Sequence, residues 1–532
     1  MDRMRPRPPR RAAACLALAA TCLALAGCGT RRSRPPATSH AASSTPAASS
    51  APTTKPPAGA TQSPFALRGV VEGFYGPTWS DAATRAVLAF MGAHAMNTFV
   101  YAPKFDPYQR TRWRQPYPAA RLAQLGRLAR YARAHGVHFV YSLSPGLSIT
   151  YSSLPDRRAL EHKLAQLRSA GVHRFMLSFD DIPHKLSAAA DIAAYHGSLA
   201  AAQVSLVRGV YAHELASDAR FRLIFTPTEY YGTKPDHYLR TLAGLPRKVS
   251  IVWTGPGVIA PTIQAAQARA FGAIVGRKPL IWYNYPVNDW TVPSGGSQPR
   301  DLFLGPVRGL APDLGSAVAG ILSNPMLQPY ASQIPLATLA RYLVDPTTYR
   351  GRKSWQAALT TAGGRAATAL TTFASAQQPY PGFNSAGHYA WTNTDPALVG
   401  QEDALLTAYR GHPGAALASA QFRQLEQTFT AWRQAAPQLT AANLGQPQLA
   451  QEIAPWVTAM AQDGQAGLDA LHLLQESHGG GAAARVKALA ALRRDIVRVE
   501  AQPVQFGGFG AYGANHPRQP NDFLQEVAVL GG

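Results

Sequence analysis

Residues 175–183 read FMLSFDDIP, an apolar run that ends in two adjacent carboxylates, Asp180 and Asp181. The run is short and its apolar residues show no helical spacing, so it predicts a buried β-strand. Strands that are apolar throughout are typical of parallel sheets covered on both faces. We therefore expect a parallel sheet in which the two acids lie at the carboxyl end of one strand, held close together by the backbone.

Two neighbouring carboxylates repel each other when both are ionised, so we expect the pKa of one of them to be raised. One acid that stays charged and one that can donate a proton suit glycoside hydrolysis. An isolated Asp-Asp pair is more often part of a solvated loop or a helix cap. The assignment therefore depends on the rest of the chain.

Short apolar runs recur along the chain. Besides residues 174–181 they cover residues 69–75, 97–101, 137–142, 222–226, 249–254, 279–284 and 319–324. Amphipathic segments separate them, and examples are residues 81–93, 119–135, 155–170 and 260–276. Strands that alternate with helices predict parallel pairing through right-handed crossovers. Eight such units predict an α/β fold, the (β/α)8 TIM barrel.

A polar segment follows each predicted strand. The segments are EGFYG at 72–76, YAPK at 101–104, SLSPG at 142–146, DD at 180–181, PTEYY at 227–231, WTG at 253–255, NYPVND at 284–289 and NP at 324–325. In a TIM barrel the carboxyl ends of the strands surround one mouth, and the active site lies there. A ring of hydrogen-bonding groups around that mouth favours a polar, hydroxyl-rich ligand.

Several of these segments resemble signature segments of glycoside hydrolase family 84, the β-N-acetylglucosaminidase family of O-GlcNAcases and hyaluronidase-like enzymes. They are residues 69–76, 101–104, 180–181, 227–230, 253–256 and 282–289. The resemblance covers about residues 65–343. It implies retaining hydrolysis of terminal β-linked N-acetylglucosamine (GlcNAc), in which the 2-acetamido oxygen of the sugar attacks the anomeric carbon and forms an oxazoline.

The expected geometry agrees with this mechanism. Retaining enzymes with a carboxylate nucleophile place two carboxyl groups about 5–5.5 Å apart on opposite sides of the bond. Neighbouring acids on one strand end are poorly arranged for that. The resemblance implies that Asp180 accepts the acetamido N–H and orients its carbonyl. It implies that Asp181 is the general acid and then the general base, with a pKa raised by Asp180 and by burial.

The resemblance also implies residues that bind the sugar hydroxyls. The Gly73 carbonyl and the Lys104 ammonium would face the 3-hydroxyl. Asp289 would accept from the 4- and 6-hydroxyls, with Asn324 nearby. Taken singly, Lys104 could be a solvated loop charge, Asp289 a helix cap and Asn324 a turn residue before a proline.

The acetamide pocket is implied in the same way. Tyr230 and Asn284 would steady the acetamide, Trp282 would form the wall against its methyl group, and Thr254 would lie near the pocket. Trp282 by itself could equally be barrel core. Many relatives carry an acid where this chain has Tyr283, and strand alternation predicts that this side chain points away from the pocket. We expect no cofactor and no metal, because the acetamide already supplies the nucleophile.

The amino-terminal residues predict export. Arginines flank an apolar segment at residues 12–27, a pattern typical of a secretory signal that is too short to span a bilayer permanently. The segment ends in LAGC at 25–28, which resembles the bacterial lipobox. This implies cleavage before Cys28 and diacylglyceryl attachment to its sulfur, so we expect a cell-surface lipoprotein on the outer face of the cytoplasmic membrane. The alternative is an ordinary secreted protein, and export by the general or the twin-arginine route stays open.

Charge and cysteine content argue against several other classes of function. The formal net charge of +22 could indicate nucleic-acid binding, but many of the arginines precede the predicted fold, so we expect no nucleic-acid partner. All three cysteines, Cys15, Cys22 and Cys28, lie in the leader. The rest of the chain therefore has no disulfide, no thiol nucleophile and no cysteine metal site.

The chain divides by composition into successive segments. Helical spacing of apolar residues at 400–410, 414–436, 449–476 and 482–500 predicts an α-helical bundle after the barrel. The predicted segments are a lipoprotein signal at 1–28, a disordered Ser/Thr/Pro/Ala linker at 29–63, the catalytic barrel at 64–346, the helical bundle at 347–504 and a loop-like tail at 505–532.

Two alternatives to an exo-acting hydrolase stay open. One is an endo-acting, hyaluronidase-like hydrolase, because the depth of the cleft depends on loops. The other is a non-catalytic glycan-binding lipoprotein, although binding alone needs no proton donor. In each case the expected partner is a GlcNAc-containing glycan or glycoconjugate, and the aglycone and the oligomeric state are open.

Overall fold

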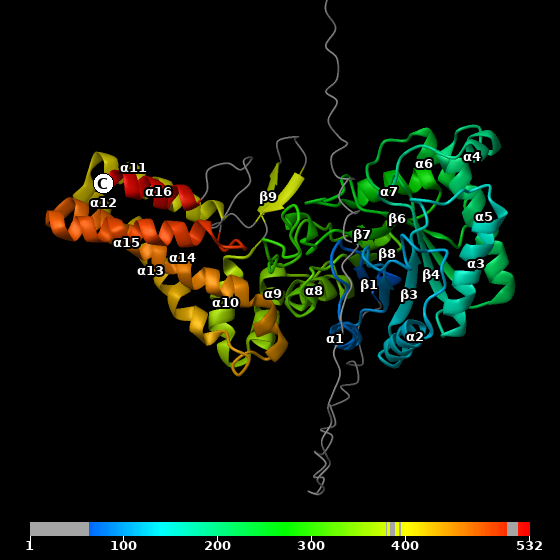
Figure 1. The fold of residues 1–532 in the computed structure, drawn as a ribbon, viewed down its shortest axis with the longest axis horizontal. Coiled ribbons are helices and arrows are strands. Elements are labelled where there is room, and N and C mark those ends of the chain that lie inside the picture. The colour runs from blue at the N-terminus through cyan, green and yellow to red at the C-terminus, as the bar shows by residue number, and fades with distance from the viewer. Residues whose placement is uncertain (1–62, 379, 384–388, 393–394, 508–519) are drawn as a thin grey trace, which may run out of the picture. The chain divides into compact units, whose positions relative to one another are not determined.

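The computed structural model describes residues 63–378, 380–383, 389–392, 395–507 and 520–532 (Figure 1). Cys28, the predicted signal at 1–28 and all but the last residue of the predicted linker at 29–63 lie outside the described residues. Among the residues that are described, no helix is both long enough and apolar enough to cross a membrane.

Eight parallel strands form a closed barrel in the order β1 to β8, and β1 pairs with β8 to close it. The predicted (β/α)8 barrel is therefore confirmed. The strands are β1 Leu67–Glu72, β2 Thr98–Tyr101, β3 His138–Leu143, β4 Arg174–Ser178, β5 Arg222–Thr226, β6 Ser250–Trp253, β7 Leu280–Tyr283 and β8 Gly320–Ser323.

Helices surround this barrel (Figure 1). They are α1 Asp81–Ala93, α2 Ala119–Ala134, α3 Leu154–Ser169, α4 Ala189–Ala194, α5 Leu199–Ser217, α6 His237–Thr241, α7 Ala265–Val275 and α8 Pro329–Val344. Serine side chains cap the first turn of three of them, since Ser80, Ser153 and Ser198 accept hydrogen bonds from backbone N–H groups of α1, α3 and α5. Each such cap contributes about 1 kcal/mol to helix stability.

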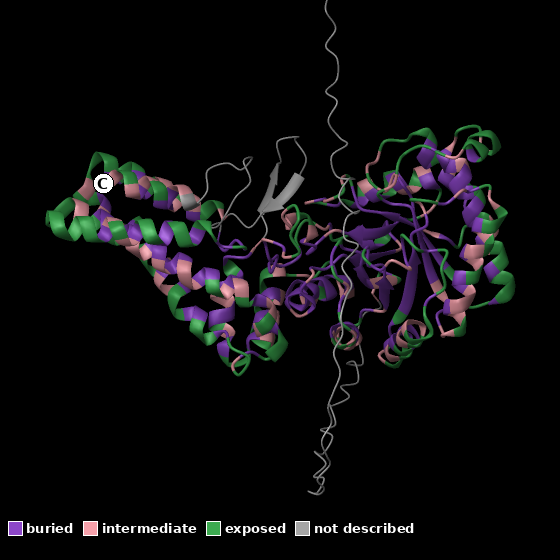
Figure 2. Ribbon diagram, in the orientation of Figure 1, coloured by how far each residue is buried: buried purple, intermediate pink, exposed green. Residues whose placement is uncertain are grey.

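Strand alternation divides the apolar side chains into two sets. One set fills the barrel interior and the other packs beneath the helices. The interior set consists of Val71, Val100, Ala102, Val140, Met176, Ile224, Val252, Leu280, Trp282 and Leu322. Because both faces of the sheet are covered, the strands are buried along most of their length, whereas the helices alternate buried and exposed residues (Figure 2).

A helical region follows the barrel, as the sequence predicts. Its helices are α9 Gly351–Gly363, α10 Ala367–Ser375, α11 Pro396–Gly411, α12 Pro413–Leu417, α13 Ala420–Ala435, α14 Pro447–Gly479, α15 Ala482–Glu500 and α16 Pro520–Leu530. Between α10 and α11 a short antiparallel pair is formed by β9 Tyr380–Phe383 and β10 Tyr389–Thr392.

The carboxyl-terminal tail corrects one expectation. Residues 505–532 were expected to be loop-like, but residues 520–530 form α16, which contacts α14 and α11. Phe523, Leu524 and Val527 of this helix are buried. Their i, i+1, i+4 spacing marks an apolar helical face, but a face this short gives a weak periodic signal, and packing on other helices stabilises it.

Candidate active site

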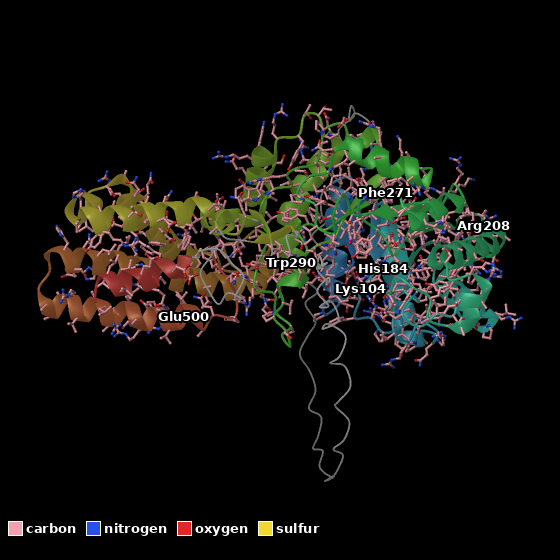
Figure 3. The ribbon with its side chains drawn as sticks, turned by 90° about the horizontal axis from the view of Figure 1, so that it is seen from above. Lys104, His184, Arg208, Phe271, Trp290 and Glu500 are labelled. Carbon is pink, nitrogen blue, oxygen red and sulfur yellow. The ribbon has the colours of Figure 1, made fainter. Side chains whose placement is uncertain are left out.

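A cavity of about 400 Å³ opens at the carboxyl ends of the barrel strands. Its lining comes from the carboxyl-terminal parts of β5, β6 and β7 and from the segments that follow β1, β2 and β4 to β8. All ten site residues named from the sequence line it, namely Gly73, Lys104, Asp180, Asp181, Tyr230, Thr254, Trp282, Asn284, Asp289 and Asn324. In Figure 3, Arg208 on α5 lies at the outer edge of the barrel, away from Lys104 of the cavity lining.

Both acids face the cavity although they are consecutive in the chain. Met176 of β4 points into the barrel, so alternation also directs Asp180, four residues later, inward. The same alternation would turn Asp181 outward. Instead, the backbone of Asp181 adopts a left-handed conformation with φ of 55°, which interrupts the extended chain. Aspartate adopts this conformation at lower cost than most residues, and such strain is characteristic of functional sites.

Asp180 is buried and its two carboxylate oxygens have different surroundings. Oδ2 forms an ion pair with the ammonium of Lys104, whose side chain is also buried. Oδ1 is buried too, but no group in the described part of the chain donates a hydrogen bond to it. A buried acceptor without a donor costs free energy, so this oxygen is suited to receive an N–H or O–H group of a ligand.

Asp181 lies at the open mouth of the cavity and accepts two tyrosine hydroxyls. Tyr75 donates to Oδ2 at 2.8 Å and Tyr230 donates to Oδ1 at 3.0 Å. Desolvation alone would raise the pKa of Asp181. The positive charge of Lys104, the two tyrosine hydrogen bonds and the charge of Arg110 outweigh it and lower the pKa below its ordinary value.

The expectation of a raised pKa for Asp181 is therefore wrong. The expectation counted the neighbouring acid and burial, both of which raise a carboxyl pKa. It did not count the donors, because Tyr75, Tyr230 and Arg110 belong to other strand ends.

A hydrogen-bond network fixes the wall of the cavity that Trp282 forms. The indole Nε1 donates to Oδ1 of Asn284 at 2.8 Å, and Nδ2 of Asn324 donates to the same oxygen at 3.0 Å. Nδ2 of Asn284 donates to the carbonyl of Val258 at 2.8 Å. The backbone N–H of Gly73 donates to Oδ1 of Asn324 at 3.3 Å. These bonds hold the indole and both amides in fixed orientations.

The remaining predicted residues also have protein partners. Oδ2 of Asp289 accepts the backbone N–H of Tyr75 at 2.7 Å, and desolvation raises the pKa of Asp289. The hydroxyl of Thr254 donates to the carbonyl of Gly257 at 2.8 Å, which closes its own loop. Tyr283 is buried and does not line the cavity, in agreement with strand alternation.

The sequence reasoning missed two polar residues that contact Asp181, Tyr75 and Arg110. Tyr75 lies within the segment 72–76 that was singled out, so its position at a strand end was an available signal. Arg110 lies in the long segment between β2 and α2, and no motif marks it. Its guanidinium donates to the Tyr75 hydroxyl at 3.0 Å and to the Asp181 carbonyl at 3.5 Å.

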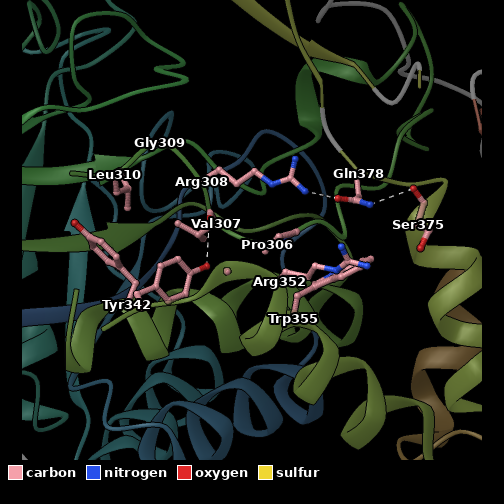
Figure 4. A pocket seen from close by; sticks show the side chains of 12 residues that line it. Pro306, Val307, Arg308, Gly309, Leu310, Tyr342, Arg352, Trp355, Ser375 and Gln378 are labelled. Carbon is pink, nitrogen blue, oxygen red and sulfur yellow. Dashed lines mark hydrogen bonds between the residues drawn. The ribbon is translucent and has the colours of Figure 1, made fainter. Parts of the chain in front are cut away.

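A second cavity, of about 530 Å³, lies between the segment 306–310 and the helices α8 to α10 (Figure 4). Its polar lining includes Arg308 and Arg352, and Arg308 donates to the side chain of Gln378. No carboxylate lines it. This cavity therefore offers no carboxyl pair, unlike the cavity at the barrel mouth. Within the described ranges no group of three histidine, cysteine, aspartate or glutamate side chains is placed to hold a metal ion.

Comparison with known proteins gives concordant findings. A family model described as beta-N-acetylglucosaminidase matches residues 68–375. Protein O-GlcNAcase from Rattus norvegicus and from Mus musculus are each 35% identical over 283 residues, which cover 52% of this chain. The chain spans only 30% of the length of these relatives. A substituted form of an O-GlcNAc hydrolase from Thermobaculum terrenum has 27% identity and a TM-score of 0.76, covering 87% of this chain and 94% of its own.

Proposed function

The chain belongs to the beta-N-acetylglucosaminidase family, and on this premise we propose that it is a retaining enzyme that removes terminal β-linked GlcNAc by substrate-assisted catalysis. The observation that carries the proposal is the unpartnered Oδ1 of Asp180 at the base of the cavity. The acetamido N–H of GlcNAc is a donor of the kind that this oxygen lacks. A carboxylate there also stabilises the positive charge that develops on the acetamide as its carbonyl attacks.

The first step forms one bond and breaks one. The acetamido oxygen attacks the anomeric carbon, and the bond from that carbon to the leaving oxygen breaks. Asp181 gives its proton to the leaving oxygen. In the second step the Asp181 carboxylate takes a proton from water as the water oxygen attacks the anomeric carbon. The bond to the oxazoline oxygen breaks, which restores the acetamide and retains the configuration.

The lowered pKa of Asp181 keeps its carboxyl ionised, as the second step requires, in which the residue acts as a base. For the first step Asp181 needs a proton. Desolvation is the largest influence that raises the pKa of Asp181. A bound sugar excludes water from the mouth of the cavity and therefore raises this pKa. A leaving oxygen beside Asp181 would also compete for the positions that the hydroxyls of Tyr75 and Tyr230 hold. We therefore assign protonation of Asp181 to the substrate complex.

The other cavity residues are assigned to binding. Trp282 forms the wall for the acetamide methyl group, and Asn284 beside it orients the acetamide. Gly73, Asp289 and Asn324 serve the sugar hydroxyls. Three remaining residues support these contacts. Lys104, expected at the 3-hydroxyl, is assigned instead to hold Asp180, and Tyr230, expected at the acetamide, is assigned instead to hold Asp181. Thr254 shapes the loop at the cavity edge.

A chromogenic β-GlcNAc glycoside tests the activity, with the matching β-glucoside as control because it lacks the acetamide. We expect release of the chromophore from the first substrate alone, retention of configuration by NMR, and inhibition by a thiazoline analogue of the oxazoline. Equal turnover of both glycosides would contradict participation of the acetamide. Internal cleavage of hyaluronan would favour the endo-acting alternative, and binding without hydrolysis would favour a glycan-binding lipoprotein.

We also propose a lipid anchor at Cys28 and a flexible tether at 29–63, on the sequence pattern of residues 12–28. The catalytic barrel would then act at the outer face of the cytoplasmic membrane. Expression of the full chain with labelled fatty acid should label the wild-type protein and not Cys28→Ser. Label on both proteins would exclude Cys28, and a soluble, unlabelled wild-type protein would favour ordinary secretion.

A further inference from the structure

Arg110 is a buried cation, with 8% of its surface exposed, at the edge of the catalytic cavity. No carboxylate of the described residues lies within ion-pair distance of its guanidinium. A buried charge is expensive unless it is hydrogen-bonded or paired. The guanidinium instead contacts two groups of the site, the hydroxyl of Tyr75 and the backbone carbonyl of Asp181, and it lies 5.4 Å from the centre of the Tyr75 ring.

These contacts determine which way the Tyr75 hydroxyl points. A guanidinium can only donate hydrogen bonds, so the Tyr75 oxygen must accept from Arg110. The hydroxyl hydrogen is then left for Oδ2 of Asp181, to which Tyr75 is 2.8 Å away. Arg110 thus orients a donor toward one carboxylate oxygen of Asp181 and also contacts the backbone of the same residue.

The backbone contact matters because Asp181 has an uncommon conformation. Its φ of 55° turns the carboxylate into the cavity against the alternation of β4. Strained conformations persist only where surrounding groups hold them. Nη2 of Arg110 donates to the backbone carbonyl of Asp181. Nη1 donates to the Tyr75 hydroxyl, which in turn donates to the Asp181 carboxylate.

We propose that Arg110 is a positioning residue for the reaction, which holds the Tyr75 hydroxyl and the Asp181 backbone so that the Asp181 carboxylate faces the glycosidic oxygen. This inference rests on the proposed function. Arg110 lies in the segment after β2 and acts on the general acid, Asp181, without touching the sugar.

Other charged and titratable groups also face Asp181 and set the background for any pH effect. They are Asp180 after β4, Lys104 after β2, Tyr75 after β1, Tyr230 after β5 and Asp289 after β7. None of them is removed in a variant of Arg110. A change in the titration of Asp181 between wild type and such a variant therefore reports the loss of Arg110.

The test compares Arg110→Gln, Arg110→Lys and the control Arg112→Gln, which removes an exposed arginine two residues along the same segment. On an unactivated GlcNAc glycoside we expect kcat of Arg110→Gln to fall roughly tenfold or more, because the acid is misplaced. The alkaline limb of its kcat/KM profile should move to higher pH, because a positive charge near Asp181 is lost. Arg110→Lys should keep the wild-type limb and recover part of kcat. Arg112→Gln should match wild type.

The outcomes separate this inference from the proposed function. Titration of the Asp181 carboxyl by ¹³C NMR, assigned with Asp181→Asn, gives its pKa whether or not the protein is active, and we expect a higher value in Arg110→Gln than in wild type. A wild-type protein that releases no GlcNAc overturns the proposed function. An unchanged titration, an unchanged alkaline limb, or an equal effect of Arg112→Gln overturns the role of Arg110. If Arg110→Gln does not fold, Tyr75→Phe should move the limb in the same direction, and an unmoved limb contradicts the proposal.

Discussion

Gly73 packs so closely against the indole of Trp282 that a Cβ atom on residue 73 would lie 2.2 Å from Cζ2 of the tryptophan. Gly73 directly follows β1 and Trp282 belongs to β7, and these two strands are separated by β8 in the barrel. The contact therefore reaches across one strand and brings two walls of the cavity together. Glycine is required here for space, since no other residue lets the backbone approach the ring this closely.

Replacing this glycine should displace the indole. Gly73→Ala should lower the free energy of unfolding by about 1–3 kcal/mol through overpacking, and lower kcat/KM for a GlcNAc glycoside because Trp282 leaves its place beside Asn284. Thermal unfolding and steady-state kinetics measure the two effects. Gly400→Ala, in α11 where an added Cβ meets no atom within 4 Å, is the control and should be neutral or slightly stabilising. Wild-type kinetics in Gly73→Ala would show that the indole position is unimportant.

The general-acid assignment predicts a dependence on the leaving group. Asp181→Asn should lose kcat/KM by roughly 10²–10⁴-fold on glycosides with poor leaving groups, and much less on activated aryl glycosides, whose leaving oxygen needs no proton. Asparagine tolerates the left-handed backbone of residue 181, so the fold should persist. Equal losses on both substrate types would contradict the acid role.

Asp180 should matter for both kinds of substrate. Asp180→Asn removes the negative charge beside the acetamide and leaves Lys104 without its ion-pair partner. We expect a loss of kcat of roughly 10²-fold or more for poor and activated leaving groups alike, because formation of the oxazoline itself is impaired. The comparison of the two substrates in parallel assays is the measurement. Normal turnover of N-acetyl substrates by this variant would refute participation of the acetamide.

Glu72 predicts a pH dependence of stability. It is fully buried at the end of β1, where Oε1 accepts the backbone N–H of Trp79 at 3.0 Å. Burial raises its pKa from 4.5 to about 8. The folded state therefore keeps a proton that the unfolded state loses, and this contribution to stability is complete below pH 4.5 and is lost as the pH rises to about 8.

Glu72→Gln should remove that dependence, because glutamine keeps the acceptor and does not ionise. The fall in Tm between pH 5 and pH 8 should be smaller in Glu72→Gln than in wild type. Glu426→Gln, on an exposed position of α13, serves as the control and should follow wild type. Parallel Tm curves for wild type and Glu72→Gln would show that Glu72 ionises normally in the folded protein.

The barrel could be predicted because its signal is local and repeated. Each strand is a short apolar run bounded by helical segments, and the stretch 174–181 contains both β4 and the two acids that follow it. Parallel pairing then places every strand end at one mouth, so residues far apart in the chain could be assigned to one cavity. Helix α16 was not predicted, because its apolar face is short and the helix is stabilised by packing on α14.

The sequence by itself determined the barrel and the mouth at its strand ends, because these follow from strand periodicity and from the rule that parallel strands end together. The family resemblance then named ten of the residues that line the cavity. Only the tertiary structure decided how Asp181 is turned and in which direction its pKa moves. The donors responsible, Tyr75, Arg110 and Tyr230, lie 106, 71 and 49 residues away in the chain. Side-chain direction and pKa depend on the groups that surround a residue in space, and the barrel brings these groups together only when it closes.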